Sequence, residues 1–181
     1  MSIIRELTHE KHMEVENLPL IQYLLHGNIT PDHYVIYLAE MTAIYKHLEN
    51  LAIAAGLFDG MPELPRAQRM QQDLDELDPN YNATLLPSTQ NYLDYMDQLS
   101  KSENCKQLFA HVYVRHLGDL YGGKLIARGV PGSGRWYEFE NRPELVKKFN
   151  DRITVDLADE AIVAFDHYNN IFQELWTRIH N

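Results

Sequence analysis

Apolar residues recur at helical spacing along most of the chain, whereas alternating strand patterns are weak, and this contrast constrains the fold most strongly. Thr30 and Pro31 are a typical helix start, with Thr as the N-cap and Pro at the first helical position. One apolar stripe continues from there to Gly56, a typical C-terminal stop. Further helices are predicted near 66–77 and 88–100, from about residue 103 up to a loop at 129–134, from Pro143 to about residue 153, and over a last stretch that carries Ala161 to Ile179. The pattern predicts an all-α helical bundle that forms a single domain over residues 1–181.

Length and composition narrow the function classes. A chain of 181 residues suffices for one substantial core. The net charge of −10 argues against a nucleic-acid-binding protein, which usually has a dominant basic face. The single cysteine, Cys105, excludes an intramolecular disulfide framework and a cysteine-cluster metal site. No signal peptide or apolar run of spanning length is visible. We therefore expect a cytoplasmic monomer that contacts neither membrane nor nucleic acid.

The segment from His111 to Leu125 has helical flanks but contains three glycines within six residues. Each glycine in a helix interior costs roughly 1 kcal/mol relative to alanine, so the pattern needs a reason. Gly118 and Gly122 are four residues apart and share a face. They indicate either a kink where another helix packs closely, or a wall without side chains against which a large flat ligand lies. Asp119 lies within this apolar stretch, and partly buried carboxylates of this kind cluster at functional sites.

Among nine histidines, only His12 has a pattern typical of a metal ligand. Glu16 follows it by four residues on the same helical face, and histidine ligands usually have their second ring nitrogen held by a carboxylate, carbonyl or water. Taken alone, the pattern at His12 favours a surface or ordinary core histidine over a metal ligand.

Two segments together resemble the heme oxygenase family. The first is HEKHMEVEN, from His9 to Asn17, and the second is RHLGDLYGG, from Arg115 to Gly123. They resemble the proximal and distal heme helices of that family, and the resemblance extends from about residue 3 to residue 176. It implies a bundle of the heme oxygenase type, with heme held between the first helix and a glycine-kinked distal helix. Tyr121 departs from the family pattern, in which a smaller, serine-like residue is common.

The resemblance also implies roles for individual residues. His12 falls on the axial ligand of the heme iron, and Glu16 on its acidic support. Arg115 and Asp119 fall on the distal polar network, with Gly118 and Gly122 against the distal heme face. The remaining matches concern the heme propionates and the pocket wall, and they are Arg5, Tyr113, Lys147, Lys148, Arg152, Phe165 and Phe172. For Lys147, Lys148 and Arg152 the register is loose, so any one of them is a candidate for the propionate contact.

The activity implied by the resemblance is oxidative cleavage of heme by O2 to biliverdin, ferrous iron and carbon monoxide. Heme b would be both substrate and cofactor, and histidine ligation leaves the opposite iron face for O2. Electrons would come from ferredoxin or another reductase, and a bilin reductase is a possible downstream partner. Basic residues that bind the propionates would favour the IXα isomer of biliverdin. The activity as a whole would belong to heme catabolism.

Three alternatives remain open from the residues. A non-heme di-iron oxidase needs paired Glu-x-x-His motifs, and the chain has one, Glu6 to His9. A thiaminase-like protein would need a nucleophilic cysteine, for which Cys105 is the single candidate. A heme carrier would keep the histidine without needing the glycine-rich distal pattern.

Overall fold

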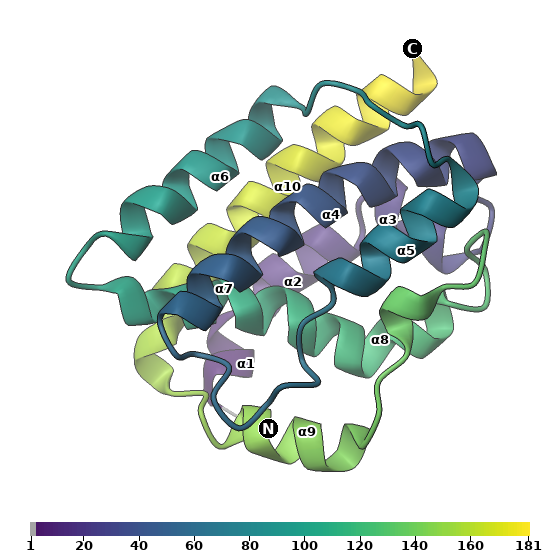
Figure 1. Cartoon of the computed structure of the whole chain (residues 1–181). Helices are drawn as coiled ribbons and strands as arrows, with labels where there is room; N and C mark the ends of the chain where they lie inside the picture. The colour runs from purple at the N-terminus through teal and green to yellow at the C-terminus, as the bar shows by residue number, and fades with distance from the viewer. Residues whose placement is uncertain (1–2) are drawn as a thin grey trace.

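The two longest helices, α4 (Pro31–Ala54) and α10 (Ala158–His180), both cross the centre of the molecule as seen in Figure 1. The computed structural model describes residues 3–181, and every regular element within them is helical. The α-helices are α1 (Ile3–Leu7), α2 (His9–Glu16), α3 (Pro19–Leu25), α4 (Pro31–Ala54), α5 (Ala67–Leu77), α6 (Pro87–Ser100), α7 (Leu108–Val112), α8 (Gly118–Ile126), α9 (Arg142–Asn150) and α10 (Ala158–His180). The all-α prediction is confirmed.

The predicted start of the long helix is confirmed in detail. Thr30 is the N-cap of α4, and its side chain accepts a hydrogen bond from the backbone N–H of His33 at 3.4 Å. Pro31 occupies the first helical position, where its missing N–H costs nothing. The apolar stripe that follows is buried against α5, α6, α7 and α10. The core is therefore built largely around the buried face of α4.

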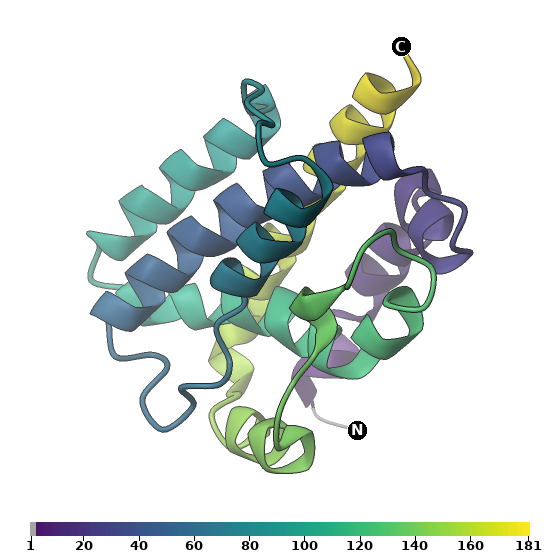
Figure 2. The same cartoon turned by 45° about the vertical axis from the view of Figure 1, so that its right-hand side comes forward.

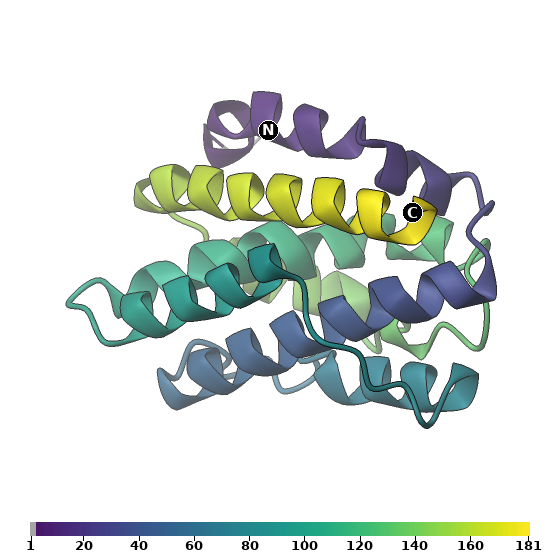
Figure 3. The same ribbon diagram turned by 90° about the horizontal axis from the view of Figure 1, so that it is seen from above.

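The helices are arranged in layers. Seen from above, α1, α2 and α3 lie on one side of α10, and α4 with α5 lies at the opposite side (Figure 3). The distal segment, which we define as α7, the turn Tyr113–Leu117 and α8, runs between these layers. Figures 1 and 2 place α9 at the end of the molecule where the chain begins. None of the helices within residues 3–181 has the length and apolar character needed to span a membrane.

The distal segment departs from regular α-helix one turn earlier than the glycines suggest. Residues Tyr113–Leu117 form a π-helical turn, and Gly118 already has α-helical dihedral angles, with φ −57° and ψ −46°. Gly118, Gly122 and Gly123 all lie within α8. π-helical turns are rare and often occur at functional sites. The irregularity predicted from the glycines is therefore present, but it belongs to the residues that precede them.

Candidate active site

A cleft lies between α2, α10 and the distal segment, and it gathers most of the side chains singled out by the sequence. Of the predicted residues, those that line it are His12, Glu16, Arg115, Gly118, Asp119, Phe165 and Phe172. They come from three regions of the chain more than 35 residues apart, so the fold creates this cleft.

His12 stands on the α2 side of the cleft. Its Nδ1 lies 3.6 Å from Oε2 of Glu16, one turn further along the helix, and its side chain is 58% exposed. Its ring meets the ring of Phe165 edge-on, with centroids 6.0 Å apart. Lys11, the preceding residue, pairs with Asp166 of α10 at 2.9 Å and ties α2 to that helix. Because Glu16 lies near Nδ1, Nε2 of His12 is left available to a ligand in the cleft.

The glycines of α8 divide into two kinds. A Cβ atom built on Gly118 or Gly122 would meet no atom within 4 Å, whereas one on Gly123 would lie 2.9 Å from Cδ1 of the Tyr137 ring. Gly123 is thus a packing glycine. Gly118 lines the cleft, and Gly122 continues its bare helix face. Close packing therefore explains Gly123, whereas a ligand surface at Gly118 and Gly122 stays a prediction.

Asp119 is buried opposite His12 and holds two hydrogen bonds through one oxygen. Its Oδ2 accepts from the Tyr45 hydroxyl at 2.5 Å and from the Trp136 indole N–H at 3.0 Å. Burial raises the pKa of Tyr45 well above its usual value, so Tyr45 remains a neutral donor. Oδ1 of Asp119 makes no hydrogen bond within residues 3–181, and is the oxygen left to accept from water in the cleft.

Arg115 closes the inner end of the cleft. Its Nε donates to the Tyr45 hydroxyl at 3.2 Å, and its guanidinium lies 4.7 Å from the centroid of the Tyr168 ring. The hydroxyls of Tyr137 and Tyr168, two further lining residues, are buried and find no partner among the described residues. Buried polar groups normally have a partner, so these hydroxyls indicate a site that holds ordered water or a polar ligand.

Sequence reasoning missed Tyr45, Trp136 and Tyr168 as site residues. Tyr45 and Tyr168 belong to apolar stripes, so periodicity assigns them to the core, where they are also found. Trp136 lies in the short 3₁₀ turn Arg135–Tyr137, and its backbone N–H donates to Oδ2 of the buried Asp73 at 2.9 Å. The available signal was the presence of polar-tipped aromatic residues within otherwise apolar stripes.

The remaining predicted residues do not line the cleft. Arg5 is exposed on α1, Tyr113 is nearly buried at 8% exposure, and Gly122 lies one turn beyond Gly118. Lys147 and Lys148 each pair with a carboxylate of α9 or the residue after it, and Arg152 donates to backbone carbonyls of the α4–α5 connection. Their contacts with a propionate stay predictions.

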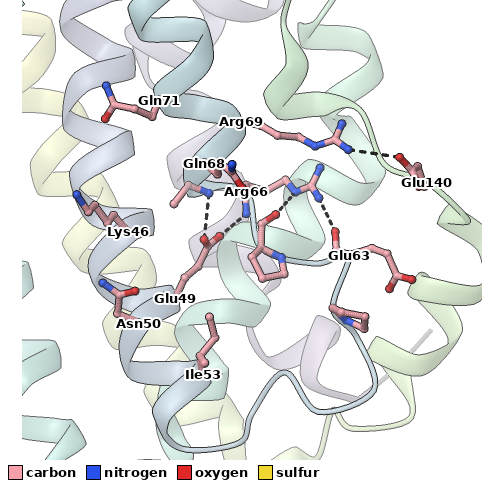
Figure 4. A pocket seen from close by; sticks show the side chains of 13 residues that line it. Lys46, Glu49, Asn50, Ile53, Glu63, Arg66, Gln68, Arg69, Gln71 and Glu140 are labelled. Atoms are coloured by element: carbon pink, nitrogen blue, oxygen red, sulfur yellow. Dashed lines mark hydrogen bonds and ion pairs between the residues drawn. The ribbon is translucent and has the colours of Figure 1, made fainter.

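A larger cavity of 570 Å³ lies between α4 and the start of α5 (Figure 4). Its central polar groups are already satisfied. Both carboxylate oxygens of Glu49 accept backbone N–H groups, from Arg66 and Ala67, and Arg66 Nε donates to the Pro65 carbonyl at 2.8 Å. Oε1 of Glu49 also meets Nε2 of the buried His116 at 2.9 Å. Glu49, in the wall of this cavity, therefore holds His116 of the π-helical turn in place. The smaller cleft is the better candidate for an active site.

The structure also bears on the alternatives. Glu6 and His9 are exposed, and no group of three or more His, Cys, Asp or Glu side chains within residues 3–181 is arranged to hold a metal ion. Cys105 is half-buried in a 3₁₀ turn outside the cleft. The carboxylate core and the pocket cysteine that the di-iron and thiaminase-like hypotheses require do not occur among these residues.

Comparisons with known proteins identify the family. The heme oxygenase family model matches residues 1–174. A heme oxygenase of Guillardia theta is 28% identical over 203 residues, covering 95% of this chain and 84% of the relative. Heme oxygenase 2 of Synechocystis sp. is 30% identical over 159 residues, covering 77% of this chain and 62% of the relative.

Solved structures share the fold. Heme oxygenase-1 of Synechocystis sp. in complex with heme superimposes with a TM-score of 0.80 and 24% identity, over 98% of this chain and 94% of that one. Heme oxygenase from Leptospira interrogans gives a TM-score of 0.83 and 24% identity, over 95% and 97% of the two chains. Because the family model spans nearly the whole sequence, the chain belongs to the heme oxygenase family of oxidoreductases.

Proposed function

We propose that this chain cleaves heme with O2 and a reductant, releasing biliverdin, ferrous iron and carbon monoxide. One observation supports this most directly: His12, with a free Nε2, and the buried Asp119, with a free Oδ1, line the same cleft. Beside them lies the bare face of α8 at Gly118 and Gly122, which we call the glycine wall. The residues are of the kinds that would hold heme, since His12 offers an imidazole nitrogen and the face of α8 at Gly118 carries no side chain to block a flat ring. Heme, when bound, supplies the iron that activates O2 and is itself the substrate.

Each residue of the cleft has a role in this proposal. His12 would hold the heme iron through Nε2, and Glu16 would orient its imidazole through Nδ1. Gly118 allows the backbone of α8 to approach the opposite face. Asp119 holds cleft water at Oδ1, while Tyr45 and Trp136 fix the carboxylate through Oδ2. Phe165 and Phe172 exclude bulk water on the α10 side.

The partners follow from the chemistry. The family resemblance implies that electrons come from a separate protein, ferredoxin or another reductase. A bilin reductase is the candidate consumer of biliverdin, and we assign the protein as a cytoplasmic monomer. The family resemblance implies opening at the α-meso carbon, giving the IXα isomer, which product chromatography would identify.

Hemin titration followed by reduction tests the proposal. We expect a Soret band that saturates at one hemin per chain. Ferredoxin, its reductase and NADPH in air should then remove this band, produce biliverdin absorption and release carbon monoxide that ferrous myoglobin traps. A Soret band that persists under these conditions would indicate a heme carrier instead. Tight iron binding without hemin would favour the di-iron alternative.

The two kinds of glycine give a paired prediction. Gly118→Ala should raise the unfolding free energy of the heme-free protein by up to about 1 kcal/mol, because alanine favours helix and its Cβ meets open space. The same variant should bind hemin less tightly, since the new methyl group stands on the glycine wall.

Gly123→Ala is the control. It should instead lower the unfolding free energy by about 1–3 kcal/mol, because its Cβ would overlap the Tyr137 ring. Thermal melts and hemin titrations of both variants check this. A Gly118→Ala protein that is more stable and binds hemin normally would contradict a heme surface at Gly118.

A further inference from the structure

The outer part of α8 presents one broad face that continues from the cleft. At about 100° per residue, Gly118, Tyr121, Gly122 and Leu125 fall within about 100° of each other around the helix axis. Tyr121 is 63% exposed and Leu125 is 56% exposed, so the bare glycines are bordered by two large, solvent-facing side chains. Tyr121 stands at one edge of this face, at the position where the family commonly has a smaller residue.

Three of the cations expected at the heme carboxylates, those in α9 and just after it, already have other partners. Lys147 pairs with Asp151 at 2.9 Å, and Lys148 pairs with Glu144 at 2.9 Å. Arg152 donates to the Leu57 carbonyl at 2.8 Å and also to the carbonyl of Asp59. Using any of them for heme would require these bonds to break.

Tyr121 and Asn150 are free to donate at the edge of the glycine wall. Asn150, the last residue of α9, donates from Nδ2 to the Tyr121 hydroxyl oxygen at 3.4 Å, and both side chains are exposed. Because the phenolic oxygen accepts this bond, its own O–H can donate elsewhere. The second N–H of the Asn150 amide is also available. Two neutral donors thus lie next to each other, and carboxylate oxygens accept such bonds well.

We propose that Tyr121, supported by Asn150, binds a heme carboxylate and so fixes how heme is rotated within the cleft. The inference rests on the proposed function, since it assigns a substrate contact in the same site. It makes Tyr121 a specificity-determining residue: the meso carbon that meets the bound oxygen depends on the rotation of the ring. In this proposal a phenol and an amide make the carboxylate contact that the resemblance assigns to Lys147, Lys148 or Arg152.

Hemin and its dimethyl ester separate carboxylate recognition from ring packing. Tyr121→Phe removes the hydroxyl and keeps the ring, so it should weaken hemin binding roughly five- to tenfold, or about 1–1.4 kcal/mol. Binding of hemin dimethyl ester, which has no carboxylate, should be unchanged by this substitution. Asn150→Ala should give a smaller loss of the same selectivity. The double variant Lys147→Met with Lys148→Met tests the rival clamp that the family resemblance implies. If Tyr121 makes the carboxylate contact, this variant should bind both ligands as the wild type does.

A second readout needs no turnover. Proton NMR of the ferric complex resolves the heme methyl signals, whose pattern reports the rotation of heme about the iron–histidine axis. We expect that pattern to change in Tyr121→Phe and to persist in the lysine double variant. Equal effects on hemin and the ester, no effect on either, or a hemin-selective loss in the lysine variant would overturn this inference alone. Failure of the wild-type chain to bind hemin would overturn the proposed function and this inference with it.

Discussion

His12→Ala should bind hemin without the spectrum of a histidine-ligated ferric heme and should form no detectable biliverdin. The reason is geometric. Among the described residues that line the cleft, His12 is the one imidazole, so no neighbouring ring can replace it as axial ligand. Its side chain is 58% exposed, so the substitution leaves the core intact and should change the unfolding free energy little. Electronic absorption and resonance Raman spectra of the 1:1 complex measure the ligation directly.

The same helix offers a matched control for this experiment. His9 is exposed at the first position of α2, three residues before His12, and lies outside the cleft. His9→Ala should therefore retain the wild-type spectrum and turnover. Adding imidazole to His12→Ala should restore the ligated spectrum, because the free base can occupy the space vacated by the side chain. An unaltered spectrum in His12→Ala would remove His12 as the ligand.

Glu16→Gln tests the support of the imidazole. Glu16 Oε2 lies 3.6 Å from Nδ1 of His12, and loss of such a support typically costs about tenfold in metal affinity or activity. We expect a loss of about this size with the histidine ligation retained. The iron–histidine stretching frequency of the ferrous complex should fall, because the imidazole loses anionic character. An unchanged frequency would mean that Glu16 does not act through His12.

The sequence predicts the helices well but cannot predict which glycine has which role. Gly118, Gly122 and Gly123 have the same local context, and a shared helix face correctly pairs the first two. Gly123 differs only because the Tyr137 ring, 14 residues later, packs against it. That contact depends on the path of the loop between α8 and α9, which has no periodicity to read. Contacts of this kind, between residues distant in sequence, can be identified only from the folded structure.

The π-helical turn has a physical explanation that lies outside the distal segment. Arg115 reaches the hydroxyl of Tyr45, and the next residue, His116, reaches the carboxylate of Glu49. Tyr45 and Glu49 are one turn apart on the same face of α4. Consecutive side chains diverge less in the wider π turn than in an α-helix, so both can reach this face. The sequence of the distal segment alone contains no sign of these partners.

Asp119→Asn should bind hemin normally but convert little of it to biliverdin. The amide keeps the size of the carboxylate and one oxygen to accept the bonds from Tyr45 and Trp136. What changes is Oδ1: an NH2 group there donates where the carboxylate accepts, so water in the cleft is reoriented or lost. Alanine is a poorer choice, because leaving two buried donors unpaired costs about 1–3 kcal/mol each. Product analysis should show lower biliverdin yield and faster oxidation of an added peroxidase substrate when hydrogen peroxide replaces the reductase.

Asp73→Asn distinguishes loss of this water site from loss of structure. Asp73 is also buried and holds the same tryptophan, but from its backbone side, where Oδ2 accepts the Trp136 N–H at 2.9 Å. It does not line the cleft. If Asp119 acts only by anchoring Trp136, Asp119→Asn should keep its biliverdin yield, because the amide oxygen still accepts the indole N–H. Under that hypothesis Asp73→Asn, which weakens the hold on the tryptophan backbone, should lose stability and yield together. If Oδ1 of Asp119 organises the water that delivers protons, Asp73→Asn should lower the melting temperature and keep the yield, whereas Asp119→Asn should lose the yield at a nearly unchanged melting temperature. Normal biliverdin yield from Asp119→Asn would exclude a role for this carboxylate in proton delivery.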